Sequence, residues 1–128
     1  MKHYKLTLLA SILILVAILM PASGVPSVGI PNIDKLVHLG MFGTLALCYY
    51  GEYVFRYKKL PKFLGAWIVM EIYALSTEIM QLFVQGRSCD VIDWIADSIG
   101  ILGAIYVFRF VYTKKIQRSK EEHKVVKQ

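Results

Sequence analysis

Four side chains that can exchange protons or bind cations lie inside apolar stretches of this chain: His38, Glu78, Asp93 and Asp97. An imidazole and carboxylates are the groups that act as general acids and bases and that ligate divalent cations. Burying such groups costs free energy unless each has a partner, so their placement is a functional hypothesis by default. We take the four as the candidate catalytic or metal-binding set, with metal and cofactor left unassigned.

A second set of polar residues could hold a ligand: Asp34, Lys35, Gln81 and Arg87. Lys35 and Arg87 are bases close to the acidic residues in sequence, and each could bind a phosphate group. Asp34 also has a simpler interpretation, because Asp34 or Asn32 could cap the helix that carries His38 one turn further on. His38 would then share one face of that helix with Asp34.

The third apolar stretch carries Glu71, Glu78 and Gln81 at spacings of seven and three, which keep all three on one helix face. Glu78 lies five residues before Phe83, about 8 Å below the outer end of the stretch. It is either a site residue or a protonated or hydrogen-bonded packing residue. Glu71 lies deeper, has no evident counterpart, and is interpreted as structural.

A turn follows at residues 85–90, where Gly86 can adopt a positive φ. Asp90 and Asp93 have the spacing of a capping box and suit the N-terminus of the next helix electrostatically. Capping is sufficient to explain Asp90. For Asp93 helix-end electrostatics and site chemistry stay open.

Asp97 precedes Gly100 and Gly103 on the same face of the last apolar stretch. Small residues let another helix approach closely, so this face is expected to pack against protein. An unpaired carboxylate at that depth would be costly. We expect Arg87, His38, a water molecule or a cation beside it.

The elements that must position these residues are long hydrophobic helices. Of 128 residues, 56% are hydrophobic and 19% charged, which favours a membrane protein over a soluble domain. Segments near the 20 residues needed to cross a bilayer occupy 6–22, 35–56, 63–84 and 91–112. We predict an all-α integral membrane bundle of four transmembrane helices, which forms a single domain over residues 1–128. The last part of this domain, 113–128, is a basic tail that is either a solvated helix or disordered.

The basic residues orient this bundle. They gather before the first span, between the second and third, and after the fourth, so the N- and C-termini are predicted to be cytoplasmic. The candidate residues then gather at the outer side. The same distribution explains the net charge of +6 through topology and lipid contact, so the lipid bilayer is the expected partner and no nucleic acid is expected.

The first span and the two cysteines have simpler interpretations than the polar residues. The first span could instead be a signal peptide, with Ala22-Ser23-Gly24 resembling a cleavage site, although a retained anchor is preferred. Cys48 and Cys89 lie at different predicted depths and are expected to be separate thiols.

The ordered set Asp34-Lys35-x-x-His38, Glu78-x-x-Gln81, Gly86-Arg87-Ser88, Asp93, Gly100 and Gly103 resembles the VanZ-like family over roughly residues 30–108. That resemblance implies a small multi-pass protein of the bacterial cell membrane. It also implies a link to the cell envelope and antibiotic resistance, since the founding member is associated with low-level teicoplanin resistance. It implies no established reaction. The family often has Pro where Gln85 stands, which implies a less rigid turn here, and Asn where Asp97 stands, which implies a site one charge more acidic.

Three functions are compatible with these patterns. The first is an outward-facing site that binds or modifies a polar lipid, a cell-wall precursor or a glycopeptide-related ligand; binding is preferred because no nucleophile with an adjacent base is recognisable. The second is a structural or regulatory membrane partner whose ion pairs lock the helices together. The third is ion or proton transport. Whether the protein is an enzyme, and its oligomeric state, are left open.

Overall fold

The computed structural model describes residues 4–21, 23 and 33–126. Within these ranges the chain forms four helices and no strand. They are α1 (Lys5–Ile18), α2 (Ile33–Tyr57), α3 (Phe63–Gln81) and α4 (Val91–Val126). The all-α prediction is confirmed.

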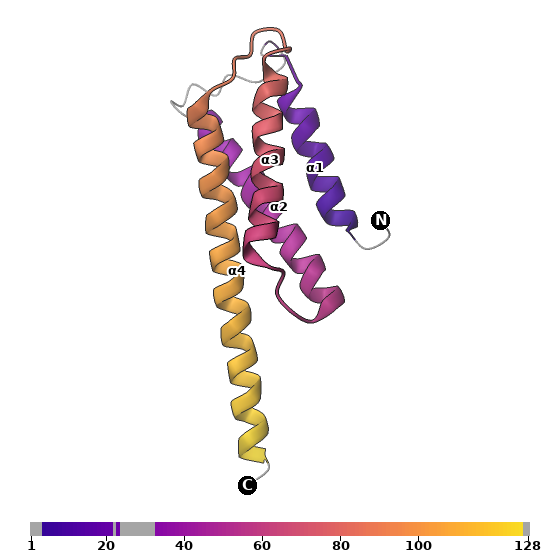
Figure 1. The fold of residues 1–128 in the computed structure, drawn as a ribbon, viewed down its shortest axis with the longest axis vertical. Coiled ribbons are helices and arrows are strands. Elements are labelled where there is room, and N and C mark those ends of the chain that lie inside the picture. The colour runs from indigo at the N-terminus through magenta and orange to yellow at the C-terminus, as the bar shows by residue number, and fades with distance from the viewer. Residues whose placement is uncertain (1–3, 22, 24–32, 127–128) are drawn as a thin grey trace.

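The helices form an elongated bundle in which α2 crosses behind the others (Figure 1). The most extensive packing joins α2 to α4, with further contacts of α1 to α2 and of α3 to α4. The end of α1, the end of α3 and the start of α4 lie together at one end of the bundle (Figure 1). The connection from α2 to α3 lies toward the opposite end, as expected for consecutive antiparallel helices.

The helix boundaries follow from a few residues. Lys58 adopts a left-handed φ of 55° directly after α2, which ends the helix. After α3, Gly86 has a φ of 76°, as predicted for the turn. Asp90 then caps α4, because its Oδ1 accepts a hydrogen bond from the backbone N–H of Ile92 at 2.8 Å. The cap predicted at Asp90 is confirmed, but the capping box with Asp93 is not formed, because the backbone N–H of Asp90 donates to Glu78.

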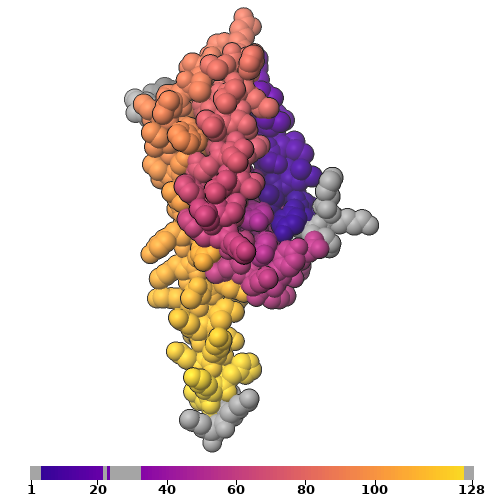
Figure 2. All heavy atoms as spheres, viewed as in Figure 1, coloured from indigo at the N-terminus to yellow at the C-terminus, as the bar shows by residue number. Residues whose placement is uncertain are grey.

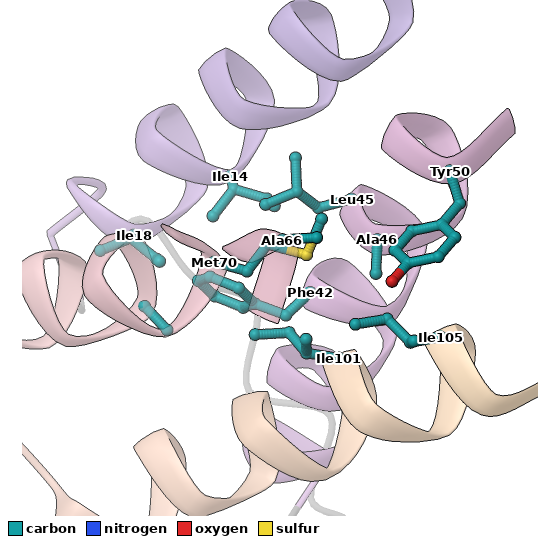
Figure 3. Packing of buried hydrophobic residues seen from close by; sticks show 11 residues of the cluster. Ile14, Ile18, Phe42, Leu45, Ala46, Tyr50, Ala66, Met70, Ile101 and Ile105 are labelled. Carbon is teal, nitrogen blue, oxygen red and sulfur yellow. The ribbon is translucent and has the colours of Figure 1, made fainter. Parts of the chain in front are cut away.

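The apolar core lies below that end of the bundle, between all four helices. Phe42 and Tyr50 of α2 are completely buried, and Figure 3 shows the α2 side chains between those of α1, α3 and α4. The other core members are Ile14, Ile18, Leu45, Ala46, Ala66, Met70, Ala74, Ile101 and Ile105. This packing fixes the rotation of α2 and therefore the direction in which His38 points, one turn before Phe42.

Gly100 lies at a close approach of α2 and α4. A Cβ atom added to Gly100 would overlap the backbone carbonyl of Leu39, and one added to Gly43 would lie 3.3 Å from the Gly100 carbonyl oxygen. The prediction that this face packs against protein is confirmed at Gly100. It is wrong at Gly103, where an added Cβ would meet nothing within 4 Å.

Helix α1 is held by polar contacts to its neighbours. Glu52 of α2 accepts hydrogen bonds from the backbone N–H groups of Leu6 and Thr7 at 2.8 and 3.0 Å, and from the Thr7 hydroxyl at 2.6 Å. The Tyr73 hydroxyl of α3 donates to the carbonyl of Ser11 at 2.6 Å. Glu52 therefore satisfies the free donors at the start of α1.

Two helices, α3 and the Val91–Val125 part of α4, are long and apolar enough to cross a membrane. Large apolar side chains on their outer faces are exposed, among them Val69, Ile72 and Ile99. A soluble monomer rarely exposes so much apolar surface. The four-crossing arrangement stays a prediction, because α1 is a shorter apolar helix and α2 is not among the candidates.

Two predicted spans extend beyond the ends of their helices. The first span was placed at 6–22, but α1 has 14 residues and ends at Ile18. The third was placed at 63–84, but α3 ends at Gln81. The predicted fourth span lies within α4, which continues past residue 112 to Val126. Of the two alternatives for the tail, its described part is therefore a helix, and it extends beyond the body of the bundle (Figure 2). Ala22 and Gly24 of the cleavage-like tripeptide lie outside the described residues.

Candidate functional site

Three helices bring His38, Glu78 and Asp97 together; these residues are called the buried triad below. Nδ1 of His38 lies 3.0 Å from Oδ1 of Asp97 and 3.7 Å from Oε1 of Glu78. The three residues expose 2%, 0% and 0% of their surface. The predicted convergence of α2, α3 and α4 on one polar site is thus what the structure shows. Of the partners expected for Asp97, the one beside it is His38.

Glu78 is oriented by the start of the next helix. Its Oε2 accepts a hydrogen bond from the backbone N–H of Asp90 at 3.2 Å, which leaves Oε1 facing His38. A carboxylate held by a backbone donor has few alternative rotamers. The short turn between α3 and α4 therefore fixes the position of Glu78, the acid that α3 contributes to the triad.

Several polar atoms in and beside the buried triad have no hydrogen-bond partner. These atoms are Oε1 of Glu78, Oδ2 of Asp97, Nε2 of Gln81 and, nearby on α4, Nε1 of Trp94. Gln81 is 2% exposed and follows Glu78 by three residues on the same helix face. A buried polar atom left without a partner costs about 1–3 kcal/mol. Unpartnered buried atoms of this kind call for an explanation, such as local strain, a catalytic role, or binding of water or an ion.

Five charged residues surround the buried triad and are called the ion-paired rim: Asp34, Lys35, Arg87, Asp90 and Asp93. Nζ of Lys35 lies 2.9 Å from Oδ1 of Asp93 and 3.3 Å from Oδ2 of Asp90. The pKa of Asp90 is lowered, first by the hydrogen bond from the Ile92 N–H and then by Lys35. The candidate residue Lys35 thus bridges the start of α2 to the start of α4.

Arg87 lies elsewhere on the rim. Its Nη1 is 3.8 Å from Oδ1 of Asp34, and its Nε donates to the backbone carbonyl of Met20 at 3.4 Å. Arg87 was one of the partners considered for Asp97, but its contacts are with Asp34 and Met20. Asp34 is not the cap of α2, since that helix begins at Ile33 and Asp34 lies within its first turn. The alternative cap, Asn32, lies outside the described residues.

Glu71 forms a separate polar contact deeper in the bundle. It accepts hydrogen bonds from Nε1 of Trp67 at 2.8 Å and from the hydroxyl of Ser98 at 2.7 Å. The structural interpretation of Glu71 agrees with these contacts. The expectation that it has no counterpart is wrong, because Ser98 of α4 is one. The position of Ser98 directly after Asp97 was the signal that sequence reasoning missed.

The site is acidic. Its five carboxylates are accompanied by only two permanent bases and one imidazole. Two overlapping groups of three have ligand atoms within 4.8 Å of one another: His38 with Glu78 and Asp97, and His38 with Asp34 and Asp93. Cys48 and Cys89 are free thiols, as predicted. The chemistry that the geometry supports is proton exchange or cation binding.

One comparison with known proteins gives a match. The family model described as VanZ/LLP1 matches residues 2–112, a range that includes the buried triad and its rim. The chain belongs to the VanZ/LLP1 family. Curated proteins and solved structures give no match. Membership of the VanZ/LLP1 family confirms the predicted resemblance and, with the apolar helices α3 and α4, indicates a membrane protein.

Proposed function

We propose that this VanZ-type protein is a multi-pass protein of the bacterial cell membrane, with one domain of four crossings. Helix α2 has 25 residues and is about 37 Å long, sufficient for a bilayer. Helix α1 is about 21 Å long and would need flanking residues or local thinning of the bilayer. The basic connection after α2 and the basic end of α4 then face the cytoplasm together with both termini.

At the outer end of this bundle, we infer a binding site for the polar part of a lipid or cell-wall precursor. One observation carries the inference: the buried triad contains carboxylate oxygens without partners, on three helices that converge at one end. Groups kept only for stability could be replaced by apolar residues at little cost. A polar ligand at this place would satisfy them. A glycopeptide-related ligand belongs to the same class of envelope molecules.

The ion-paired rim can take part in such binding. The side chains of Lys35 and Asp90 are partly exposed, and so are those of Arg87 and Asp34. Exposed ion pairs contribute little stability, so an incoming phosphate can compete for their bases. Lys35 and Arg87 would then bind the ligand while the triad lies beneath it. Binding is favoured over modification because the buried triad and the ion-paired rim contain no Ser, Thr or Cys side chain that could act as a nucleophile.

Native mass spectrometry of the protein extracted from bacterial membranes tests the proposal. Wild-type protein is expected to retain a polar lipid or precursor, and Glu78→Ala to lose it. Glu71→Gln is the matched control, since it alters a hydrogen-bonded carboxylate of the same helix away from the triad. A wild-type protein that carries no such molecule, or equal retention in Glu78→Ala, would contradict the proposal.

A structural or regulatory role is the second candidate, and the contact of His38 with residues of both α3 and α4 favours it. It predicts that substitutions in the triad lower protein abundance and thermal stability in proportion to any loss of function. Loss of function at normal abundance would exclude it.

Ion or proton transport is less well supported. The acids that could continue a relay inward are engaged elsewhere: Glu71 with Trp67 and Ser98, and Glu52 with the start of α1. A pH-gradient assay in proteoliposomes separates this candidate from the others, since only transport predicts a flux.

A further inference from the structure

We propose that His38, Glu78 and Asp97 form a binding site for one divalent transition-metal cation, with Mn²⁺ or Zn²⁺ as the class that fits. One ligand atom from each residue lies within 4.8 Å of the others. Ligands of a single ion at about 2.1 Å lie about 3.0–3.4 Å apart in octahedral or tetrahedral geometry. The separations of 3.0 and 3.7 Å from His38 Nδ1 need only small rotamer adjustments to reach this.

The charge of the triad fits a divalent cation. Two carboxylates and a neutral imidazole would leave two uncompensated negative charges in a completely buried position. A divalent cation makes the group electrically neutral without requiring protons. The nearest bases do not serve this purpose, because Lys35 contacts Asp90 and Asp93, and Arg87 contacts Asp34.

The orphaned oxygens are an observation independent of the clustering. Oε1 of Glu78 and Oδ2 of Asp97 belong to side chains that are at least 99% buried, and neither has a hydrogen-bond partner. Oε1 of Glu78 faces His38, so it points into the triad. A cation between the three side chains would give Oε1 of Glu78 a partner, and would also give one to Oδ2 of Asp97 when that carboxylate binds through both oxygens. Gln81, whose Nε2 is also orphaned, could bind a water ligand of that cation.

The second group of three is a weaker cation site. Oδ1 of Asp93 lies 2.9 Å from Nζ of Lys35, and Asp34 is paired with Arg87 and has a side chain that is 52% exposed. Both acids therefore already have compensating bases, whereas those of the buried triad have only His38.

The ligand types select the class of cation. The imidazole suits Zn²⁺ and the two carboxylates suit Mn²⁺, while the carboxylates exclude a preference for soft Cu⁺. Three protein ligands leave coordination positions open, as in sites where a metal contacts a substrate oxygen. Glu78 is held by the Asp90 N–H, the kind of outer contact that orients metal ligands.

Metal binding by the purified full-length chain in detergent tests the proposal. Protein stripped with a chelator is titrated with Mn²⁺ or Zn²⁺ alone, and bound metal is counted by plasma mass spectrometry. About one ion per chain is expected for wild type. Glu78→Gln and Asp97→Asn should each weaken binding at least about tenfold, the lower end of what losing even an outer-shell partner costs. Glu71→Gln should bind as wild type does.

A second measurement keeps the proposal testable if those variants do not fold. In wild-type protein loaded with Mn²⁺, pulsed electron paramagnetic resonance should detect coupling to an imidazole nitrogen. Absence of stoichiometric metal, absence of nitrogen coupling, or equal loss of metal in Glu71→Gln would each overturn it. The metal site and the proposed lipid ligand are argued from the same unpartnered oxygens, but the two experiments separate them. Metal without lipid refutes only the proposed function. Lipid retained after the metal is stripped, with no metal rebinding, refutes only the metal site.

Discussion

The backbone N–H of Asp90 donates to Oε2 of Glu78 at 3.2 Å, so the residue that caps α4 also orients the acid that α3 contributes to the triad. The cap of α4 and the position of Glu78 in the triad are thereby coupled through the short turn between α3 and α4. Disturbing the cap should disturb the triad even though Asp90 does not touch His38 or Asp97 through its side chain.

The carboxylate of Asp90, which caps α4, predicts that thermal stability depends on pH. The pKa of Asp90 is lowered from its ordinary value of 3.8, chiefly by the Ile92 N–H. A lowered folded-state pKa gives stability that is present above the unfolded value and is lost as the pH falls through the folded one. Thermal unfolding in detergent between pH 7 and pH 3 should show a declining Tm at the acidic end, and Asp90→Asn should reduce that decline. An unchanged slope would show that the ionised cap contributes nothing.

The close approach of α2 and α4 predicts that replacing two glycines of α4 with alanine changes stability by very different amounts. Gly100→Ala should lower stability by about 1–3 kcal/mol or more, because the new methyl group would overlap the Leu39 carbonyl. Gly103→Ala is the control and should be neutral or slightly stabilising, since its added Cβ meets open space. Thermal unfolding of both variants in one detergent makes the comparison. Equal effects would contradict the packing described.

The ion pair between Lys35 and Asp93 predicts that substitutions of these two residues have non-additive effects on thermal stability. Lys35→Met leaves the buried Asp93 without its base, so it should lower Tm more than Asp93→Asn does. The double variant should be more stable than the sum of the two single changes predicts. A double-mutant cycle measures this interaction, and additivity within error would mean that the pair contributes no stability.

The proposed orientation predicts the labelling of the two native cysteines. Cys89 is exposed in the turn between α3 and α4, whereas Cys48 is half-buried within α2. A membrane-impermeant maleimide added to intact cells should therefore label the wild type but not Cys89→Ser. Labelling of Cys89 only after the cells are opened would place that turn, and the polar site with it, in the cytoplasm.

Much of this site was predictable from helical periodicity and chain direction. Antiparallel helices with polar residues near matching ends must bring His38, Glu78 and Asp97 to one end. Periodicity could not choose the partner of Arg87, because Arg87 lies in a turn whose path depends on packing. It also could not distinguish Gly100 from Gly103, because only the crossing of α2 decides which glycine is covered.

Helix lengths were predicted less well, for a related reason. Hydropathy reports where an apolar stretch ends, whereas a helix ends where its backbone hydrogen bonds stop. In the tail beyond residue 112, good helix formers and the Arg118–Glu122 contact at 3.5 Å extend the helix without any apolar requirement. At α3, the opposite occurs: apolar residues continue to Val84 after the helix has ended at Gln81.

Because α4 is one continuous helix, a tilt at one of its ends displaces the other end. This helix of 36 residues carries Asp93 and Asp97 near one end and the basic segment at the other, with no proline between them. The arm from the Gly100 contact to the last turn is about 39 Å long, so a tilt of about 5° there would displace that turn by about 3 Å. In the proposed orientation, a ligand that tilts α4 at the outer site would move the basic end of α4 on the opposite side of the membrane.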